Sequence, residues 1–285
     1  MLIDLQIHST YSDGYLSPTE LAENLKSHGI KAASLTDHNT VGGLVEFARA
    51  CRKNGIKYIP GLELYVKMGS KKFNILWYNF DDGHPDLHKL LRGSQLRRRM
   101  AMRKFLEKLK TTGLNIDVYK ILDKYSHYIP LNHVIDDIFS APENRAIARK
   151  VIGKKIREED IINTFFYNNN LGHLHETCVE IKDVLNLRKR VGGQIILNHP
   201  GKYDHLEKNF LIKLKELGVD GIEVLSPHHS IGAVMYSQYI ANELKFITTG
   251  GSDFHKFEEN GLIKCSCNYF KIDSGYLPGV KKVIG

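Results

Sequence analysis

Short apolar strands alternate with helical segments at both ends of this 285-residue chain, and this alternation limits the folds that it can adopt. Up to about residue 80 the strand-like runs are "LIDLQI", "AASLT", "KYIPGLELYV" and "FNILWY"; after about residue 190 they return as "GQIILN", "GVDGIEVL", "KFITT" and "CSCNYFKI". Such alternation favours parallel βα units. Only helical patterns are found between the two parts. We therefore predict an α/β fold, a TIM-like barrel made of residues 1–83 and 191–285, with residues 84–190 inserted as helices.

The sequence contains no apolar run long enough to cross a bilayer and no signal-peptide pattern at its first residues. We therefore expect a cytoplasmic protein with no membrane partner. Its four cysteines, Cys51, Cys178, Cys265 and Cys267, form no Cys-x-x-Cys pair, which indicates reduced structural thiols. A zinc role for Cys265 and Cys267 is the alternative for that pair.

Positive charge is concentrated in one helical stretch of the predicted insertion. The formal net charge of +8 suits an anionic partner but does not identify it. The basic residues of the stretch are Arg92, Arg97, Arg98, Arg99, Arg103, Lys104, Lys108 and Lys110. One interpretation is a solvated amphipathic helix. The other is a basic surface that steers a phosphate-bearing substrate, including a nucleic acid, towards a nearby site.

The polar residues that follow the predicted strands are nearly all of types that bind metals. They are His8, Asp13, Asp37, His38, Glu63, His199, His228, His229, Asp253 and His255. In a barrel the carboxyl ends of the parallel strands share one face, so we expect these side chains to converge. A multinuclear metal site is the hypothesis that explains them together.

Five ordered motifs, "DLQIHSTYSDG", "SLTDHNT", "GLELYV", "LNHPG" and "GGSDFH", resemble those of the PHP family of metal-dependent phosphoesterases. The resemblance is to its small stand-alone bacterial enzymes, which act on nucleotides and RNA ends. It implies a distorted seven-stranded barrel with one to three divalent ions, Mn, Fe or Zn. It also implies three sets of ligands: Gln6, His8, Glu63 and Asp253; Glu63, Asn74 and His199; Asp13, His38 and His255.

This chain departs from the family pattern at three positions. Gln6 and Asn74 stand where the family has histidine, and both changes affect the two ions that Glu63 would bridge. Leu131 stands where the insertion of the family tends to carry arginine, a residue suited to bidentate phosphate binding. The expected metal ligands are then His8, Asp13, His38, Glu63, His199, Asp253 and His255.

The resemblance predicts hydrolysis of phosphate esters in a nucleotide or at the 5′ end of short RNA or DNA, with activity reduced by Gln6 and Asn74. We expect Asp253 and His229 to act in catalysis, and His133 and His229 to bind the phosphate. Asp37 would either orient an imidazole or hold a loop. The partner would be a phosphorylated small molecule, a nucleotide or a short oligonucleotide. Two alternatives are a degenerate relative that binds metal or nucleotide without catalysis, and a nucleic-acid binder that uses the basic helix.

Overall fold

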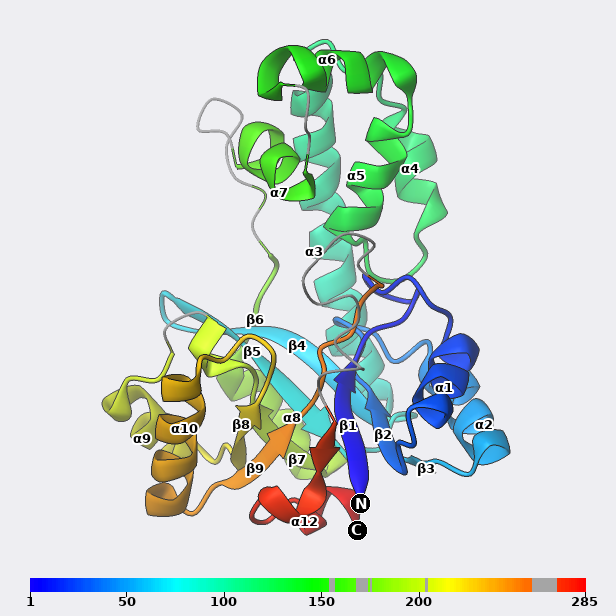
Figure 1. Cartoon of the computed structure of the whole chain (residues 1–285). Helices are drawn as coiled ribbons and strands as arrows, with labels where there is room; N and C mark the ends of the chain where they lie inside the picture. The colour runs from blue at the N-terminus through cyan, green and yellow to red at the C-terminus, as the bar shows by residue number, and fades with distance from the viewer. Residues whose placement is uncertain (154–156, 168–173, 175, 203–204, 258–270) are drawn as a thin grey trace. The chain divides into compact units, whose positions relative to one another are not determined.

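Two units make up the chain in the computed structural model, which describes residues 1–153, 157–167, 174, 176–202, 205–257 and 271–285. The sheet unit consists of Met1–Leu91 and Cys178–Gly285, and the helical unit consists of Arg92–Thr177 (Figure 1). Each unit has its own cluster of buried apolar side chains.

The sheet unit contains all the described strands, with helices between them. The strands are β1 (Leu2–Ile7), β2 (Ala32–Leu35), β3 (Lys57–Tyr58), β4 (Gly61–Met68), β5 (Lys71–Tyr78), β6 (Val179–Glu180), β7 (Gln194–Leu197), β8 (Gly221–Leu225), β9 (Ile247–Gly250) and β10 (Ile272–Asp273). The helices of this unit are α1 (Pro18–Ser27), α2 (Leu44–Asn54), α8 (Ile181–Val191), η2 (Pro200–Lys202), α9 (Lys208–Leu217), α10 (Ile231–Leu244), η3 (Ser274–Tyr276) and α12 (Lys281–Ile284). The predicted α/β class is confirmed.

The strands form two mixed sheets, ordered β10-β1-β2-β3 and β6-β4-β5-β7-β8-β9. Parallel pairs join β1 to β2 and β7 to β8 to β9, as the alternating pattern predicts. Single parallel bridges, Ile7 to Phe254 and His38 to Glu63, connect the two sheets just beyond the ends of β1 and β2. A closed barrel is not seen among the residues that the structure describes.

Part of the N-terminal half does not follow the parallel pattern. Strands β4 and β5 pair antiparallel along their whole length, from Gly61 opposite Tyr78 to Met68 opposite Lys71. Only two residues connect them, which is enough for a hairpin but far too short for a parallel crossover. The predicted strand "KYIPGLELYV" is also divided into β3 and β4 at Pro60, which has no N–H for a sheet hydrogen bond.

The helical unit has a continuous core of its own, built around α3 (Figure 1). Its helices are α3 (Pro85–Lys110, which begins in the sheet unit), α4 (Val118–Lys124), α5 (Leu131–Phe139), α6 (Pro142–Ile152), α7 (Glu158–Ile161) and the π-helical turn η1 (Ile162–Phe166).

One residue of the predicted basic surface lies inside this core. Arg98 is only 1% exposed, its Nη1 is 2.8 Å from Oε1 of Glu176, and its Nε donates to the carbonyl of Ile129. Its guanidinium also lies over the ring of Tyr128. Arg98 therefore serves the packing of the unit and does not contribute to an exposed basic surface.

Some predicted features fall outside the part of the chain that the structure describes. These are Cys265, Cys267 and all but the end of the predicted closing strand, of which β10 is the described portion. Of the described cysteines, Cys51 is buried and Cys178 is half-buried. None of the described helices is long and apolar enough to cross a membrane.

Candidate functional site

All seven expected metal ligands lie in the sheet unit, on segments at or just beyond strand ends or on β4. Their side chains form two overlapping groups, in each of which the nitrogen and oxygen atoms lie within 4.8 Å of one another. The first group is His8, Asp13, His38 and His255, and the second is His8, Glu63 and Asp253. The seventh, His199, has Nε2 3.4 Å from Oε1 of Glu63. Segments far apart in sequence thus meet at one place.

The first group is arranged around the carboxylate of Asp13. Its Oδ1 lies 3.4 Å from Nε2 of His255 and 3.5 Å from Nδ1 of His8, while its Oδ2 lies 3.4 Å from Nε2 of His38. The rings of His8 and His255 stack with centroids 4.2 Å apart. Burial alone would raise the pKa of Asp13, but His38 and His255 outweigh it and hold this pKa well below its usual range. The group therefore offers a carboxylate together with three imidazoles.

Glu63 is the centre of the second group and is completely buried. Nε2 of His8 lies 3.1 Å from Oε2 of Glu63 and 3.1 Å from Oδ1 of Asp253. The pKa values of both carboxyls are well below their usual range, because the nearby imidazoles outweigh the effect of burial. The same two carboxylates outweigh burial at His8 and raise its pKa well above normal. Two negative charges in so small a buried volume need a positive partner, which is either protonated His8 or a bound cation.

Gln6 and Asn74, the two departures from the family pattern, both point their amide nitrogens at these carboxylates. Nε2 of Gln6 donates to Oδ1 of Asp253 at 2.9 Å, and Nδ2 of Asn74 donates to Oε1 of Glu63 at 2.7 Å. Asn198 donates to the same oxygen of Glu63 at 2.7 Å. An ionised carboxylate only accepts hydrogen bonds, so these amides act as donors and compete with a cation for its oxygens.

The site fits a divalent metal ion by its donor set and by its unsatisfied atoms. Imidazole nitrogens and carboxylate oxygens are the ligands that Zn, Mn and Fe accept. Nε2 of His8 and Oε2 of Glu63 are buried and make no hydrogen bond to any described residue, although they face each other. Buried polar atoms are normally paired, so this gap in the hydrogen bonding indicates a place for a ligand.

Three buried carboxylates beneath the site hold the backbone of the segments that carry the ligands. Asp37 accepts from N of Ser9 at 2.7 Å, Asp4 from N of Ser252 at 2.9 Å, and Glu223 from N of His199 at 3.0 Å. Asp37 thus takes the loop role that was one of its two predicted alternatives. Sequence reasoning missed Asp4, although it shares a strand face with Gln6 and His8. It also missed Glu223, two residues along β8 from its first residue.

Burial raises the pKa of all three supporting carboxyls. The pKa of Asp4 rises to about 6, that of Glu223 rises well above its usual range, and that of Asp37 also lies above its ordinary value. Two ligand residues of these segments have unusual backbone conformations. His199, which donates its N–H to Glu223, has φ of 23°. Asp253, which follows Ser252 and donates its N–H to the carbonyl of Gln6, has φ of 49°. Residues other than glycine rarely adopt positive φ, and such strain persists only where the surroundings enforce it. The supporting hydrogen bonds provide that enforcement.

The two adjacent histidines after β8 have different surroundings. Nδ1 of His229 donates to the carbonyl of Val224 at 2.9 Å, and its Nε2 accepts from N of Gly201 at 3.1 Å. Both ring nitrogens are therefore engaged with the backbone. His228 instead has Nε2 2.6 Å from Oδ2 of Asp253, with Nζ of Lys202 3.4 Å away. The geometry therefore favours His228, rather than the predicted His229, as the histidine that acts in catalysis.

His133 and Leu131 lie in the helical unit, where α5 begins. Leu131 packs against the core of that unit, as expected for an apolar replacement. The N–H of His133 donates to the side chain of Asn132. A role for His133 in binding phosphate stays a prediction.

Comparisons with known proteins agree on one family. A family model described as the PHP domain matches residues 4–174 of this chain. The chain is 28% identical over 260 residues to the phosphoribosyl 1,2-cyclic phosphate 1,2-diphosphodiesterase of Eggerthella lenta, covering 90% of this chain and 94% of the relative. It is also 28% identical over 272 residues to the 3′,5′-nucleoside bisphosphate phosphatase of Chromobacterium violaceum, covering 91% and 89%. A solved protein of Bifidobacterium adolescentis, described as a candidate metal-dependent phosphoesterase, shares the fold: the TM-score is 0.80 at 20% identity, over 99% of this chain and 95% of the other.

Proposed function

This chain belongs to the PHP domain family, and on that premise we propose that it is a metal-dependent phosphoesterase acting on nucleotides or on the 5′ ends of short RNA or DNA. The observation that supports this most strongly is the convergence of three carboxylates and four imidazoles at one place in the sheet unit. Both curated relatives described above are named for the cleavage of phosphate esters. A distorted barrel and a cytoplasmic location belong to the same proposal, the former supported by the two bridges between the sheets.

One to three ions would be held by the residues of the two groups. Asp13, His38 and His255 would hold one ion, and His8, Glu63 and Asp253 another, with His199 adding a nitrogen beside Glu63. When bound, such ions lower the pKa of a water molecule and neutralise charge on phosphate oxygens.

The residues at the edge of the site would bind and protonate the substrate. Lys202 has Nζ 3.8 Å from Oδ2 of Asp253 and brings a positive charge that attracts a phosphate oxygen. His228 is held in place by Asp253, and its imidazole can give a proton to the oxygen of the departing group. Asp253 would therefore serve twice, as a metal ligand and as the partner that orients His228.

Removal of metal is the direct test of this proposal. Dialysis against a chelator should reduce hydrolysis of a 5′-nucleotide and of a short 5′-phosphorylated RNA at least about a hundredfold, because phosphate charge would then be neutralised by side chains alone. Addition of Mn²⁺ or Zn²⁺ should restore it. Metal content and hydrolysis are measured on the same samples. Full activity in a chain shown to be free of metal would overturn the proposal.

The contacts of Gln6 and Asn74 favour one other function, binding of metal or nucleotide without turnover. Each amide occupies a carboxylate oxygen that a metal would otherwise take. A chain that binds metal stoichiometrically yet hydrolyses none of the phosphate esters offered would fit this second function and exclude the first.

Substitution of the two adjacent histidines separates their roles. The change His228→Ala should lower kcat about a hundredfold. It should also abolish the fall of kcat at high pH that is caused by deprotonation of the proton donor. Metal content should not change. The change His229→Ala should instead lower stability by about 1–3 kcal/mol, because the N–H of Gly201 and the carbonyl of Val224 lose their partner. The opposite outcome, a kinetic loss at His229 with full stability and no loss at His228, would return the role to His229.

A further inference from the structure

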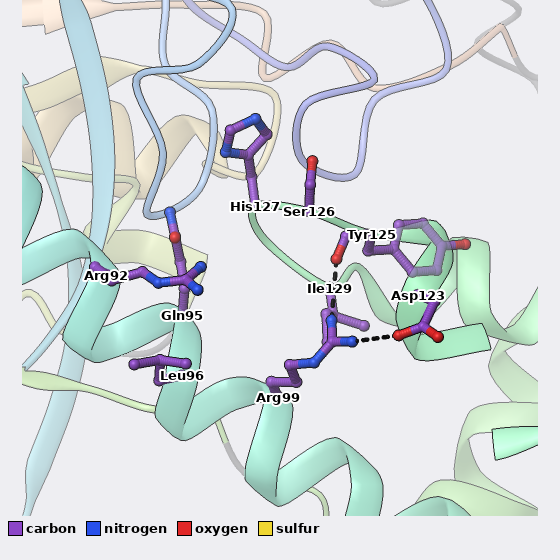
Figure 2. Close-up of a pocket in the computed structure, with 9 residues that line it drawn as sticks. All are labelled: Arg92, Gln95, Leu96, Arg99, Asp123, Tyr125, Ser126, His127 and Ile129. Carbon is purple, nitrogen blue, oxygen red and sulfur yellow. Dashed lines mark hydrogen bonds and ion pairs between the residues drawn. The ribbon is translucent and has the colours of Figure 1, made fainter. Parts of the chain in front are cut away.

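The helical unit contains a pocket of about 380 Å³ whose lining residues all belong to that unit. Residues 92–99 of α3 form one side, and residues 123–129, at the end of α4 and just beyond it, form the other (Figure 2). None of these residues belongs to the groups of carboxylates and imidazoles described above. The pocket is therefore distinct from those groups, and the ligand that it could bind is inferred from its own lining residues.

Arg99 makes the pocket a preformed structure. Its Nη1 donates to the carbonyl of Leu122 at 2.7 Å. The same Nη1 donates to the carbonyl of Tyr125 at 3.2 Å, and Nη2 lies 2.8 Å from Oδ1 of Asp123 (Figure 2). These bonds fasten the segment after α4 to α3, so the two sides of the pocket are held at a fixed spacing. They also neutralise Asp123, the one acid of the lining, so that it does not repel an anion.

The remaining polar groups of the lining are hydrogen-bond donors suited to an anion. Arg92 is exposed and makes no hydrogen bond or ion pair with any other described residue, which leaves its guanidinium for a ligand. Ser126 and His127 stand on the opposite side, and Gln95 stands next to Arg92 on α3 (Figure 2). Two arginines against one acid give the pocket a net positive charge. Arginine beside hydroxyl and imidazole donors is typical of phosphate recognition.

The size and apolar part of the lining point to a ligand larger than a phosphate ion. Small-molecule sites occupy about 300–1,000 Å³, and this pocket lies in that range. Leu96, which is exposed, and Tyr125, which is half-buried, add apolar and aromatic surface next to the donors, whereas Ile129 is almost completely buried. We propose that this pocket binds a nucleotide unit, its phosphate held by Arg92 and its nucleoside by the apolar side chains. The inference goes beyond the proposed function and rests on it only for the choice of probes.

The test measures binding to the full chain with probes that the chain cannot hydrolyse. The probes are an adenosine 5′-phosphonate in which a methylene replaces the ester oxygen, a tetranucleotide with the same 5′ group and with a methylene in place of both ester oxygens of every internucleotide linkage, and inorganic phosphate. Hydrogen exchange of residues 92–99 and 122–129 shows whether this pocket is occupied, and titration gives the affinity. Because no probe is turned over, the result does not depend on hydrolysis elsewhere.

The variant Arg92→Gln should weaken nucleotide binding about tenfold or more, since it removes a charged hydrogen bond. Arg97→Gln is the matched control, because Arg97 is an exposed arginine of the same helix outside the lining, and it should bind as the parent does. Protection by both nucleotide probes supports a site for free nucleotides, and protection by the tetranucleotide alone supports a site for nucleic acid. Absence of protection with every probe, equal affinity of Arg92→Gln, or binding of phosphate as tight as that of the nucleotide would overturn the proposal.

Discussion

Replacement of Glu63 by glutamine is expected to reduce kcat/KM for a phosphate ester about a thousandfold. Glu63 is completely buried, accepts hydrogen bonds from Asn74 and Asn198, and lies 3.1 Å from His8, so the amide removes a negative charge from the middle of the second group of ligands. An ion that acts on a phosphate is worth several kcal/mol of transition-state stabilisation, and about 1.4 kcal/mol corresponds to each tenfold. Metal content per chain should fall with activity.

Two further variants make this result interpretable. Glu23→Gln changes the same side-chain type at an exposed position of the same unit and should leave metal content and activity unchanged. Glu63→Asp keeps the charge on a shorter side chain and should give intermediate metal content. Circular dichroism of all three shows whether the fold is intact. A folded Glu63→Gln chain with full metal content and more than a tenth of the activity would refute the assignment of Glu63 as a ligand.

The double change Gln6→His with Asn74→His is expected to raise both metal content and hydrolysis. In the present chain the two amides donate to Asp253 and Glu63, the same carboxylates that an ion would need. Each histidine replaces an amide N–H, which bonds to the carboxylate, with an imidazole nitrogen whose lone pair can bind the metal. We expect kcat/KM to rise about tenfold or more, in keeping with the cost of losing a partner in a metal site. Each single change should do less, because residues that share ligands do not act additively.

Metal analysis and kinetics on the single and double variants test this expectation, with Gln238→His as control, a change of the same type at a half-buried residue of α10 that belongs to neither group of ligands. Unchanged metal content in a folded double variant would show that Gln6 and Asn74 do not limit loading. Suppose the double variant gains metal and still hydrolyses no ester. Then Leu131 and the helical unit become the limiting features, and binding without catalysis becomes the better description.

The convergence of the expected ligands could be predicted from the sequence because all of them except Glu63, which lies on β4, follow a strand in a short motif. Parallel strands of one sheet place their carboxyl ends at one edge, so the strand pattern predicts that His8 lies near His38, after β1 and β2, and that His199 lies near Asp253, after β7 and β9. The pairing of β4 with β5 needed a different signal, the two-residue Gly69–Ser70 connection between them. A short loop containing glycine predicts a hairpin, whereas strand-helix alternation alone predicts parallel neighbours.

Other features depend on packing that no local pattern contains. His228 and His229 are neighbours of the same type, and only the positions of Gly201, Val224 and Asp253 decide which ring faces the site. Arg98 stands between two other arginines in a charged run, so nothing nearby marks it as buried. Its partner, Glu176, lies far along the chain, and charge counting cannot detect such a pair.

The hydrogen bonds that Asp4, Asp37 and Glu223 make to the ligand-bearing segments bear on how this protein acquires its ions. Since the loops are held by groups inside the chain, we expect their shape to be the same before and after an ion binds. Binding of an ion, or exchange of one ion for another, would then require no refolding. The protein would discriminate little between Mn, Fe and Zn, and the supply in its surroundings would decide which ion is bound. Preparations from different growth media should accordingly carry the metals that those media supply, in chains that fold alike.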